Sequence, residues 1–495
     1  MSSAQLQPDA NLTNHDLAPV GIDQRTWSTW SIAALWISMA ACVPTYMLAS
    51  SLIEVGMNWW QAILTVFLGN AIVVVPMIMN AHAGTKYGIP FPVFCRASFG
   101  VLGANIPALM RAVVACGWFG IQTWIGGDAI FRICGVFFPT LLDPAAATML
   151  GISAAQFSCF MLFWAIHIVI ICKGIDSIRL LLQFKAPLLI ALGLLLLAWA
   201  YRAAGGFGPM LSAPSAFDTG GSKSGQFWAF FVPALTRMVG FWATLSLNIP
   251  DFSRYAKSQR AQMFGQAIGL PLTMALYSFI GVAVTSATAV IYGHAMWDPV
   301  TVLTQFTNPA LLIIAMFALC LATLATNLAA NVVSPANDFS NLAPKLISFR
   351  TGGVLTGIIG ILMMPWKLIA DPTGYIFVWL VGYSALLGPI GGILICDYFV
   401  IRRRVLDLPD LYRMHGRYRY HSGFSYAAIA ALLIGIAPNV PGFLVAIKVV
   451  STESVGPFWS ELYHYAWFVG FALSFAAYFL LRSIAATHPQ PRTSP

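Results

Sequence analysis

The fold of this chain is decided by the stretch Trp242-Ala243-Thr244-Leu245-Ser246-Leu247-Asn248-Ile249-Pro250, which Asp251 follows at once. The stretch begins as an apolar segment suited to a membrane helix. Because proline has no N–H to donate and its ring crowds the preceding turn, we expect the helix to break or unwind near Asn248. A broken helix exposes carbonyl groups, which the bilayer tolerates only where protein or a cavity covers them. The stretch therefore predicts a break inside a membrane-embedded core.

The same pattern occurs early in the chain, at Trp36-Ile37-Ser38-Met39-Ala40-Ala41-Cys42-Val43-Pro44, with identical spacing from tryptophan to proline. Two ordinary proline kinks are one explanation, since prolines are tolerated in membrane helices. The other explanation is a transporter built from inverted repeats. In such transporters, matched broken helices meet near the middle of the bilayer and hold a substrate or an ion.

The composition indicates a membrane protein. Of the 495 residues, 59% are hydrophobic and 9% are charged. Apolar runs of roughly 20 residues, long enough to cross a bilayer, recur along the chain. The net charge of +9 resides in the loops between these runs, so we expect no nucleic-acid partner. The eight cysteines show no metal-ligand spacing, so we expect no metal cofactor. The first thirty or so residues are polar, so we expect no cleavable signal peptide.

The apolar runs predict an all-α membrane protein with about twelve transmembrane helices. These helices are expected at residues 30–53, 59–81, 104–135, 149–172, 186–201, 227–249, 268–292, 309–333, 354–366, 375–396, 426–449 and 458–481. The spans group into a first repeat (about 30–201), an inverted second repeat (about 227–398) and two extra helices (about 426–481). Residues 1–29 and 482–495 are expected to be cytoplasmic tails of a transporter domain over 30–481.

The distribution of Lys and Arg predicts the orientation, because positively charged loops stay cytoplasmic. The loops on the side of the N-terminus carry most of these residues, including the run Arg402, Arg403 and Arg404. The loops on the other side keep few, among them Lys223 and Lys367. We therefore expect both termini in the cytoplasm and a multi-pass protein in the cell (inner or plasma) membrane.

The third span carries an aromatic residue and an amide on one face. Trp118 and Gln122 are one helical turn apart and face the same side. An indole beside an amide offers a stacking surface with a hydrogen-bond donor and acceptor, which suits a flat, amide-rich ring. The alternative is an aromatic side chain packed on a neighbouring helix beside a hydrogen-bonded glutamine.

The eighth span carries two amides on one face. Asn327 and Asn331 are one turn apart, with Thr326 beside them. A buried amide without a partner costs several kcal/mol in a bilayer. The pattern therefore indicates either a polar cavity or a tight contact between helices, and the sequence leaves both open.

The charged residues within or near the spans support no carboxylate proton relay. The aspartates of this region, Asp251 and Asp338, are expected at cytoplasmic ends rather than in mid-span. Arg111 lies close enough to an end for its side chain to reach the interface. Arg237 lies deeper and has no assigned role, and His167 is expected to be a hydrogen-bonded core residue. Carbonyl and hydroxyl groups at the breaks suit a sodium ion better than a proton.

Three motifs together closely resemble the nucleobase–cation symporter-1 family, which includes hydantoin, allantoin and uracil permeases. These motifs are residues 82–93 (HAGTKYGIPFPV), 118–124 (WFGIQTW) and 248–255 (NIPDFSRY). The resemblance covers nearly the whole chain. It implies the LeuT-type fold of five plus five inverted spans, here with two extra C-terminal helices. It also implies secondary active uptake of a small planar ring with a cation by alternating access, and no enzymatic activity.

The resemblance implies a substrate site in which Trp118 and Trp242 sandwich the ring. Gln122 and Asn331 are implied to hydrogen-bond the ureide or imide edge of the ring, with Asn327 close by. Cys42, two residues before the proline of the first span, occupies a position where a substrate contact is expected. The partners are therefore a small heterocyclic substrate and membrane lipid, and the sequence does not determine the oligomeric state.

The resemblance also implies a sodium site, which this sequence matches incompletely. Ser38 and Ala41 match carbonyl ligands from the first span, Ala322 matches one from the eighth span, and Thr326 matches a hydroxyl ligand. Ala325 stands where a second hydroxyl is expected, and its side chain has no oxygen. Sodium and proton both remain as the coupling ion.

An amino-acid or other small-solute symporter on the same fold is the alternative function. It predicts helix ends directed at a carboxylate group and does not require the paired tryptophan and glutamine. The sequence does not determine which ring is carried.

Overall fold

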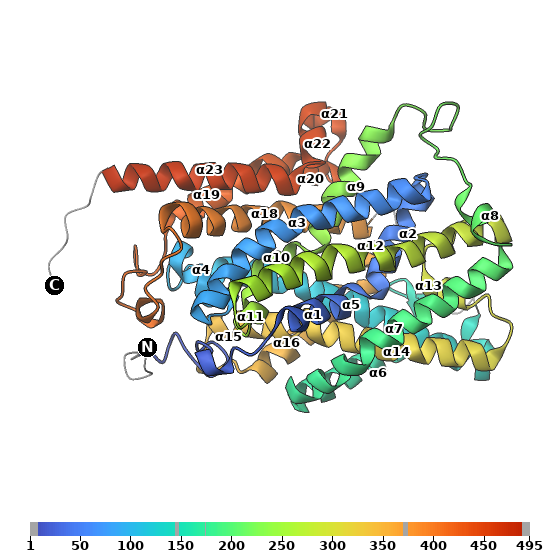
Figure 1. Ribbon diagram of the computed structural model, residues 1–495, viewed down its shortest axis with the longest axis horizontal. Coiled ribbons are helices and arrows are strands. Elements are labelled where there is room, and N and C mark those ends of the chain that lie inside the picture. The colour runs from blue at the N-terminus through green and yellow to red at the C-terminus, as the bar shows by residue number, and fades with distance from the viewer. Residues whose placement is uncertain (1–7, 144–147, 174, 370–374, 488–495) are drawn as a thin grey trace.

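The structure is a computed structural model that describes residues 8–143, 148–173, 175–369 and 375–487. Helices make up the membrane part (Figure 1). A two-residue hairpin, β1 (Thr148–Met149) with β2 (Ile152–Ser153), is the sheet found in the described part of the chain. The first and last described residues lie at one end of the bundle, termed the terminus end. The helices α8 (Phe207–Leu211) and α13 (Pro299–Leu303) lie at the other end, termed the far end (Figure 1).

The first predicted break is present. The first span consists of α1 (Thr29–Ala40) and α2 (Val43–Val55), which are bent by 59° at their junction. Cys42 between them is fully extended, and Pro44 sits in the first turn of α2, where its missing N–H costs nothing. The helix therefore stops just before the proline and restarts with it.

The break in the sixth span is misplaced in the sequence prediction. Helix α9 (Phe227–Phe241) ends at Trp242, and α10 (Ala243–Asn248) follows directly. At Ile249 the backbone stays helical, with φ −51° and ψ −27°, and Pro250 simply begins α11 (Pro250–Ser253). A proline is accepted in the first turn of a helix, so it imposes no break at Asn248. The two spans share their spacing from tryptophan to proline but not the position of the break.

The remaining spans are α3 (Trp59–Tyr87), α5 (Asn105–Phe137), α6 (Ala154–Lys173), α7 (Ile175–Ala203), α12 (Gln259–Tyr292), α14 (Pro309–Asn331) with α15 (Val333–Leu342), α16 (Phe349–Leu362), α18 (Tyr375–Ile395), α19 (Tyr426–Ile436) with α20 (Val440–Ala446), and α23 (Ala466–Thr487). Among the described residues, eight helices are long and apolar enough to cross a membrane, and the bent pair is a ninth. Three shorter apolar helices, within α7, α9 and α16, correspond to the remaining predicted spans. Each of the twelve predicted spans thus has a helix.

Small residues bring the broken helices close to their neighbours. A Cβ added at Gly269 of α12 would lie 2.9 Å from the Cβ of Trp36 and 3.0 Å from the Cα of Ala33, so α1 and α12 are in backbone contact there. Close packing through glycine is typical of membrane helices, because no hydrophobic effect drives their association. Figure 1 shows α1 and α12 side by side.

Two further helices bound the centre of the bundle. Helix α5 packs against α6, α14, α15 and α16. Helix α14 ends at Asn331, and Val332 interrupts the span before α15 continues toward the terminus end. A third discontinuity thus lies near the two predicted breaks.

Candidate functional site

A small cavity lies where both broken spans face α5 and α14. Its volume is about 30 Å³, enough for about one water molecule and too small for a ring. The conformation is therefore closed around the centre. The cavity is lined by Met39, Cys42, Pro44, Trp118, Gln122, Phe241, Trp242, Thr244, Leu245, Thr326, Ala330 and Asn331.

Aromatic side chains form much of this central cavity. Trp118 and Phe241 meet edge to face with their ring centroids 5.3 Å apart, and Phe241 meets Trp242 in the same way at 5.0 Å. Trp36, on the other broken span, meets Trp242 at 5.3 Å. The Nε1 of Trp118 donates a hydrogen bond to the hydroxyl of Tyr383 at 3.2 Å. Phe241 therefore contacts both of the predicted stacking residues.

Two polar atoms of the lining have no hydrogen-bond partner. They are Oε1 of Gln122 and Nε1 of Trp242, both buried. An unpaired buried polar group costs about 1–3 kcal/mol, and the cost is recovered when a ligand supplies the missing partner. An acceptor and a donor on neighbouring walls are what a ring bearing N–H and C=O groups requires.

The two asparagines of α14 have different surroundings. Asn331 lines the cavity, whereas Asn327 does not. Instead the Nδ2 of Asn327 lies within hydrogen-bond distance of Phe119 O (3.0 Å), Thr123 Oγ1 (3.1 Å) and His167 Nε2 (3.1 Å). Its Oδ1 accepts a hydrogen bond from Nδ2 of Asn331 at 3.0 Å. Asn327 therefore ties α14 to α5 and α6 and orients Asn331, so both interpretations of this pair apply, one to each residue.

His167 is buried, and both of its ring nitrogens have partners. Its Nε2 faces the amide N–H of Asn327 and so acts as the acceptor, which leaves Nδ1 to carry the proton. Nδ1 then donates to Phe163 O at 2.8 Å. The side chain is a hydrogen-bonded core residue, as predicted, and it braces Asn327. Arg237 lies in α9 and is not among the residues that line the cavity.

The candidate cation ligands lie at two helix segments. Ser38 and Ala41 lie at the C-terminal end of α1, where the last carbonyls of a helix lack partners within it. On α14 the hydroxyl of Thr326 donates to Ala322 O at 2.9 Å. Ala325, beside them, is buried and offers no side-chain oxygen. Within the described ranges, no group of three or more His, Cys, Asp or Glu residues is arranged to hold a metal ion.

The terminus end of the cavity is closed by buried polar contacts, termed the polar seal: Arg111, Asp338, Asn248, Ser334 and Asp251. Arg111 and Asp338, both fully buried, form an ion pair of 3.0 Å. The amide of Asn248 is hydrogen-bonded to the hydroxyl of Ser334, and Oδ1 of Asp251 accepts from Phe91 N at 2.9 Å. The expectation that Arg111 reaches the membrane interface is wrong, because Asp338 holds it in the core.

A second layer of polar contacts lies beneath the seal. Arg96, in the connecting helix α4 (Phe91–Phe99), donates to Asn341 Oδ1 at 2.6 Å and to Leu12 O at 2.7 Å. Burial lowers the pKa of Arg96 to about 10, so it remains charged at neutral pH. Tyr412 donates to Leu17 O at 2.8 Å. The segment before α1 is thus anchored across the terminus end.

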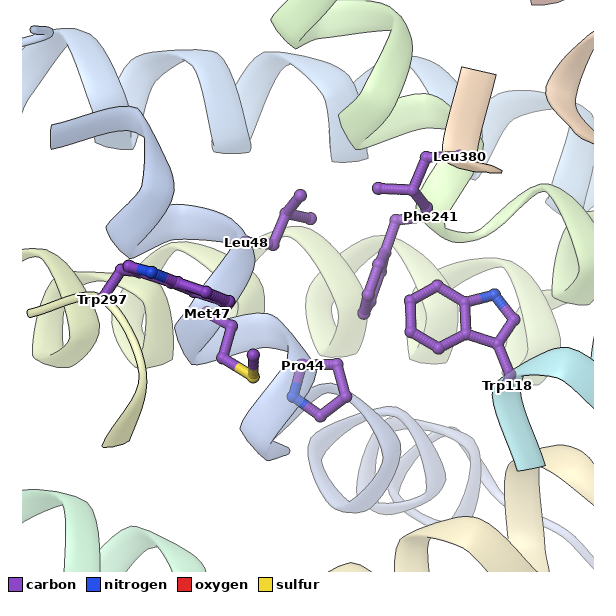
Figure 2. A pocket seen from close by; sticks show the side chains of 7 residues that line it. All are labelled: Pro44, Met47, Leu48, Trp118, Phe241, Trp297 and Leu380. Carbon is purple, nitrogen blue, oxygen red and sulfur yellow. The ribbon is translucent and has the colours of Figure 1, made fainter. Parts of the chain in front are cut away.

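The far end of the cavity is closed by apolar side chains. Figure 2 shows them around a void of about 10 Å³ next to the central cavity. Pro44, Trp118 and Phe241 line both spaces. The remaining side chains, termed the apolar partition, are Met47, Leu48, Trp297 and Leu380.

Sequence reasoning missed Phe241, Thr244 and Tyr383. The first two were missed because the break was expected at Asn248; with the break at Trp242, consecutive residues on either side of it face the cavity. No sequence motif marks Tyr383 as part of the site, because its contact with Trp118 joins two residues that are 265 positions apart in the chain.

The comparisons agree with this architecture. A family model described as permease for cytosine/purines, uracil, thiamine and allantoin matches residues 19–470. A purine-uracil permease of Arabidopsis thaliana is 47% identical over 479 residues, which cover 96% of this chain and 79% of the relative. An allantoin permease of Bacillus subtilis is 39% identical over 485 residues, which cover 98% of this chain and 95% of the relative.

Among solved structures, the nucleobase–cation-symport-1 transporter MHP1, closed with bromovinylhydantoin bound, superposes with a TM-score of 0.78 at 27% identity and covers 97% of both chains. A Na⁺-coupled sialic acid symporter, 14% identical, has a TM-score of 0.63 over 92% of this chain and 90% of its own, and shows the fold alone. These likenesses confirm the predicted LeuT-type fold. Because the family model spans most of the sequence, the chain belongs to the family of permeases for cytosine/purines, uracil, thiamine and allantoin.

Proposed function

We propose that this protein carries a small planar nucleobase or ureide ring, of the uracil, allantoin or hydantoin class, across the cell membrane by cation-coupled secondary active transport. The observation that carries the proposal is the unpaired Oε1 of Gln122 in a cavity walled by Trp118 and Trp242. The substrates named for the permease relatives are consistent with it.

In the proposed complex the ring enters between the planes of Trp118 and Trp242. Its N–H group donates to Oε1 of Gln122, and its C=O group accepts from the second N–H of the Asn331 amide. Asn327 stays outside the contact surface and fixes the direction of the Asn331 amide. Cys42 lines the same cavity, and its Sγ lies 3.2 Å from Thr45 Oγ1; we retain it as a substrate contact.

Alternating access then requires the two ends of the cavity to open in turn. At the far end the apolar partition has to move, and at the terminus end the polar seal has to separate. A substrate drives such a change only by binding one state better than another. Pairing the buried Oε1 of Gln122 supplies that difference for the occluded state.

The coupling ion is proposed to lie between the end of α1 and α14, with Ser38, Ala41, Ala322 and Thr326 as the oxygen donors. Replacement of one hydroxyl by Ala325 predicts weak sodium binding or coupling to protons. The positive-inside distribution of Lys and Arg supports a cytoplasmic terminus end, in the inner or plasma membrane.

Uptake of labelled uracil, allantoin and hydantoin tests the substrate site. Gln122→Ala is expected to lower uptake of the preferred ring roughly five- to hundredfold, because it removes the hydrogen-bond acceptor. Trp118→Ala is expected to do the same through lost stacking. Gln226→Ala and Trp228→Ala, at exposed far-end positions, are the matched controls. Normal uptake in both site variants would refute the proposed site.

Two further measurements separate the remaining alternatives. Uptake with choline in place of sodium identifies the coupling ion, because unchanged uptake excludes sodium. Competition by amino acids tests the alternative symporter: inhibition by an amino acid but by none of the three rings would replace the proposed substrate class.

A further inference from the structure

A second, larger cavity opens at the far end of the bundle. Its volume is about 350 Å³, compared with about 30 Å³ at the centre. It lies among α2, α5, α6, α13 and the short helix α17 (Pro365–Leu368). This volume is within the range of ordinary small-molecule sites, which begins at about 300 Å³.

Three tryptophans line the outer cavity. The rings of Trp124 and Trp366 are 5.9 Å apart and tilted by 54°. The indole N–H of Trp366 donates to Leu150 O at 3.1 Å, which fixes its plane. Trp297 comes from the segment before α13. The face of an indole can stack on a flat ring, including a neutral heterocycle that carries polar groups at its edge.

Three charged side chains complete the lining: Asp128, Arg132 and Asp298. The Nε of Arg132 lies 3.6 Å from Oδ2 of Asp128, which is an ion pair but too long for a hydrogen bond. That Nε has no hydrogen-bond partner. Asp298 caps α13 by accepting from the N–H groups of Val300 and Thr301, both at 3.1 Å. An acceptor and a donor beside Trp124 therefore remain available to a ligand.

The outer cavity is aligned with the central one. Asp128 follows Trp118 by ten residues on α5, which places it about 15 Å further along the helix axis. Met47 and Trp297 line both the outer cavity and the small void that borders the central cavity. The apolar partition thus has the outer cavity on one side and the central cavity on the other.

We infer that the outer cavity is a second binding site for the same class of planar N–H and C=O ring, occupied before the ring passes the apolar partition. Trp124, Trp297 and Trp366 provide its stacking walls, Asp128 accepts a ring N–H, and Arg132 donates to a ring carbonyl. The inference rests on the proposed function for the identity of the ring.

A cation is the competing ligand for two carboxylates, and the surroundings argue against it. Arg132 places a positive charge in the same cavity, so the ion pair with Asp128 already neutralises one carboxylate. The described residues contain no cluster of three or more metal-binding side chains there. A neutral ring can hydrogen-bond to both Asp128 and Arg132, and the charges of these two side chains still balance each other.

The test is equilibrium binding of the radiolabelled ring that gives the highest uptake to the purified full-length protein. Wild type is expected to bind close to two rings per chain, and Trp118→Ala close to one. Asp128→Asn keeps the shape of the side chain but weakens the acceptor, and is also expected to bind close to one. Asp218→Asn, an exposed far-end aspartate outside both cavities, is the matched control. Trp124→Leu gives the same information if Asp128→Asn does not fold.

The outcomes separate the two proposals. One ring per wild-type chain, with binding abolished by Trp118→Ala and unchanged by Asp128→Asn, overturns the outer site and leaves the central site intact. No binding of any ring to wild type overturns the proposed function itself. With both sites present, Asp128→Asn lowers kcat/KM of uptake at low ring concentration, whereas Asp218→Asn does not.

Discussion

On the terminus side of the central cavity, Arg111 and Asp338 form an ion pair of 3.0 Å with both side chains fully buried. On the far side, Met47, Trp297 and Leu380 close the cavity through apolar contact alone (Figure 2). A buried charged hydrogen bond is directional and costly to leave unpaired, so it is either made or broken. Apolar side chains change rotamer with small changes in energy. We therefore expect the terminus end to open as a discrete event, and the far end to open through side-chain movement.

The two ends also differ in how many layers of contacts close the central cavity. Behind the polar seal, Arg96 and Tyr412 hold the segment before α1 across the terminus end. Behind the apolar partition lies an open cavity of about 350 Å³. In this conformation fewer layers of side chains separate the central cavity from the far end than from the terminus end. The following variants test that comparison, beginning with the largest expected effect.

Breaking the ion pair of the polar seal is expected to have the largest effect. Arg111→Met leaves Asp338 buried without its partner and is expected to cost about 3–5 kcal/mol of stability, with loss of uptake. The melting temperature in one detergent checks this. The double variant Arg111→Met/Asp338→Leu removes both charges and is expected to recover most of the loss. A double variant as unstable as the single would show that the pair itself is not what matters.

Asp251→Ala tests the second contact of the seal. It leaves the N–H of Phe91 without an acceptor and is expected to cost about 1–3 kcal/mol. Asp251→Asn keeps an oxygen in the same place and is expected to lose less. Thermal unfolding of both is compared with that of Asp23→Ala, an exposed aspartate near the same end. Equal melting temperatures for the two Asp251 variants would contradict the hydrogen-bond explanation.

Trp297→Ala tests the apolar partition. Cys42 lines the central cavity, so in a variant with Cys42 as its single cysteine the rate of labelling by a small thiol reagent reports access. Removing the indole is expected to raise that rate about tenfold, equivalent to roughly 1.4 kcal/mol in the opening equilibrium. Trp228→Ala, an exposed tryptophan at the far end, is the control. Equal labelling rates in both variants would mean that the far end is closed elsewhere.

Tyr412→Phe is expected to have the smallest effect. It removes the hydrogen bond to Leu17 O and should cost about 0.5–1.5 kcal/mol, without loss of the fold. Hydrogen exchange of residues 8–27 is expected to increase, while exchange in α5 stays unchanged. Tyr201→Phe, an exposed far-end tyrosine, serves for comparison. Faster exchange throughout the chain would indicate general destabilisation instead.

The sequence by itself determined the class, the number of spans and the face of the third span that lines the central cavity. Apolar length fixes which segments cross a bilayer, because every membrane helix has to match its thickness. Helical periodicity placed Trp118 and Gln122 on one face, and both line the central cavity. Both are properties of one helix and its solvent, so they can be read without knowing the neighbours.

Only the tertiary structure decided which residues contact one another. It moved the break of the sixth span from Asn248 to Trp242 and paired Arg111 with Asp338 across 227 residues of chain. It also placed Asn331 in the lining of the central cavity and Asn327 behind it. It also formed the outer cavity from six elements, α2, α5, β2, α6, α13 and α17. A residue's type and spacing give the direction of its side chain, but the group it meets depends on which distant helix packs there, and that is set by the packing of the whole bundle.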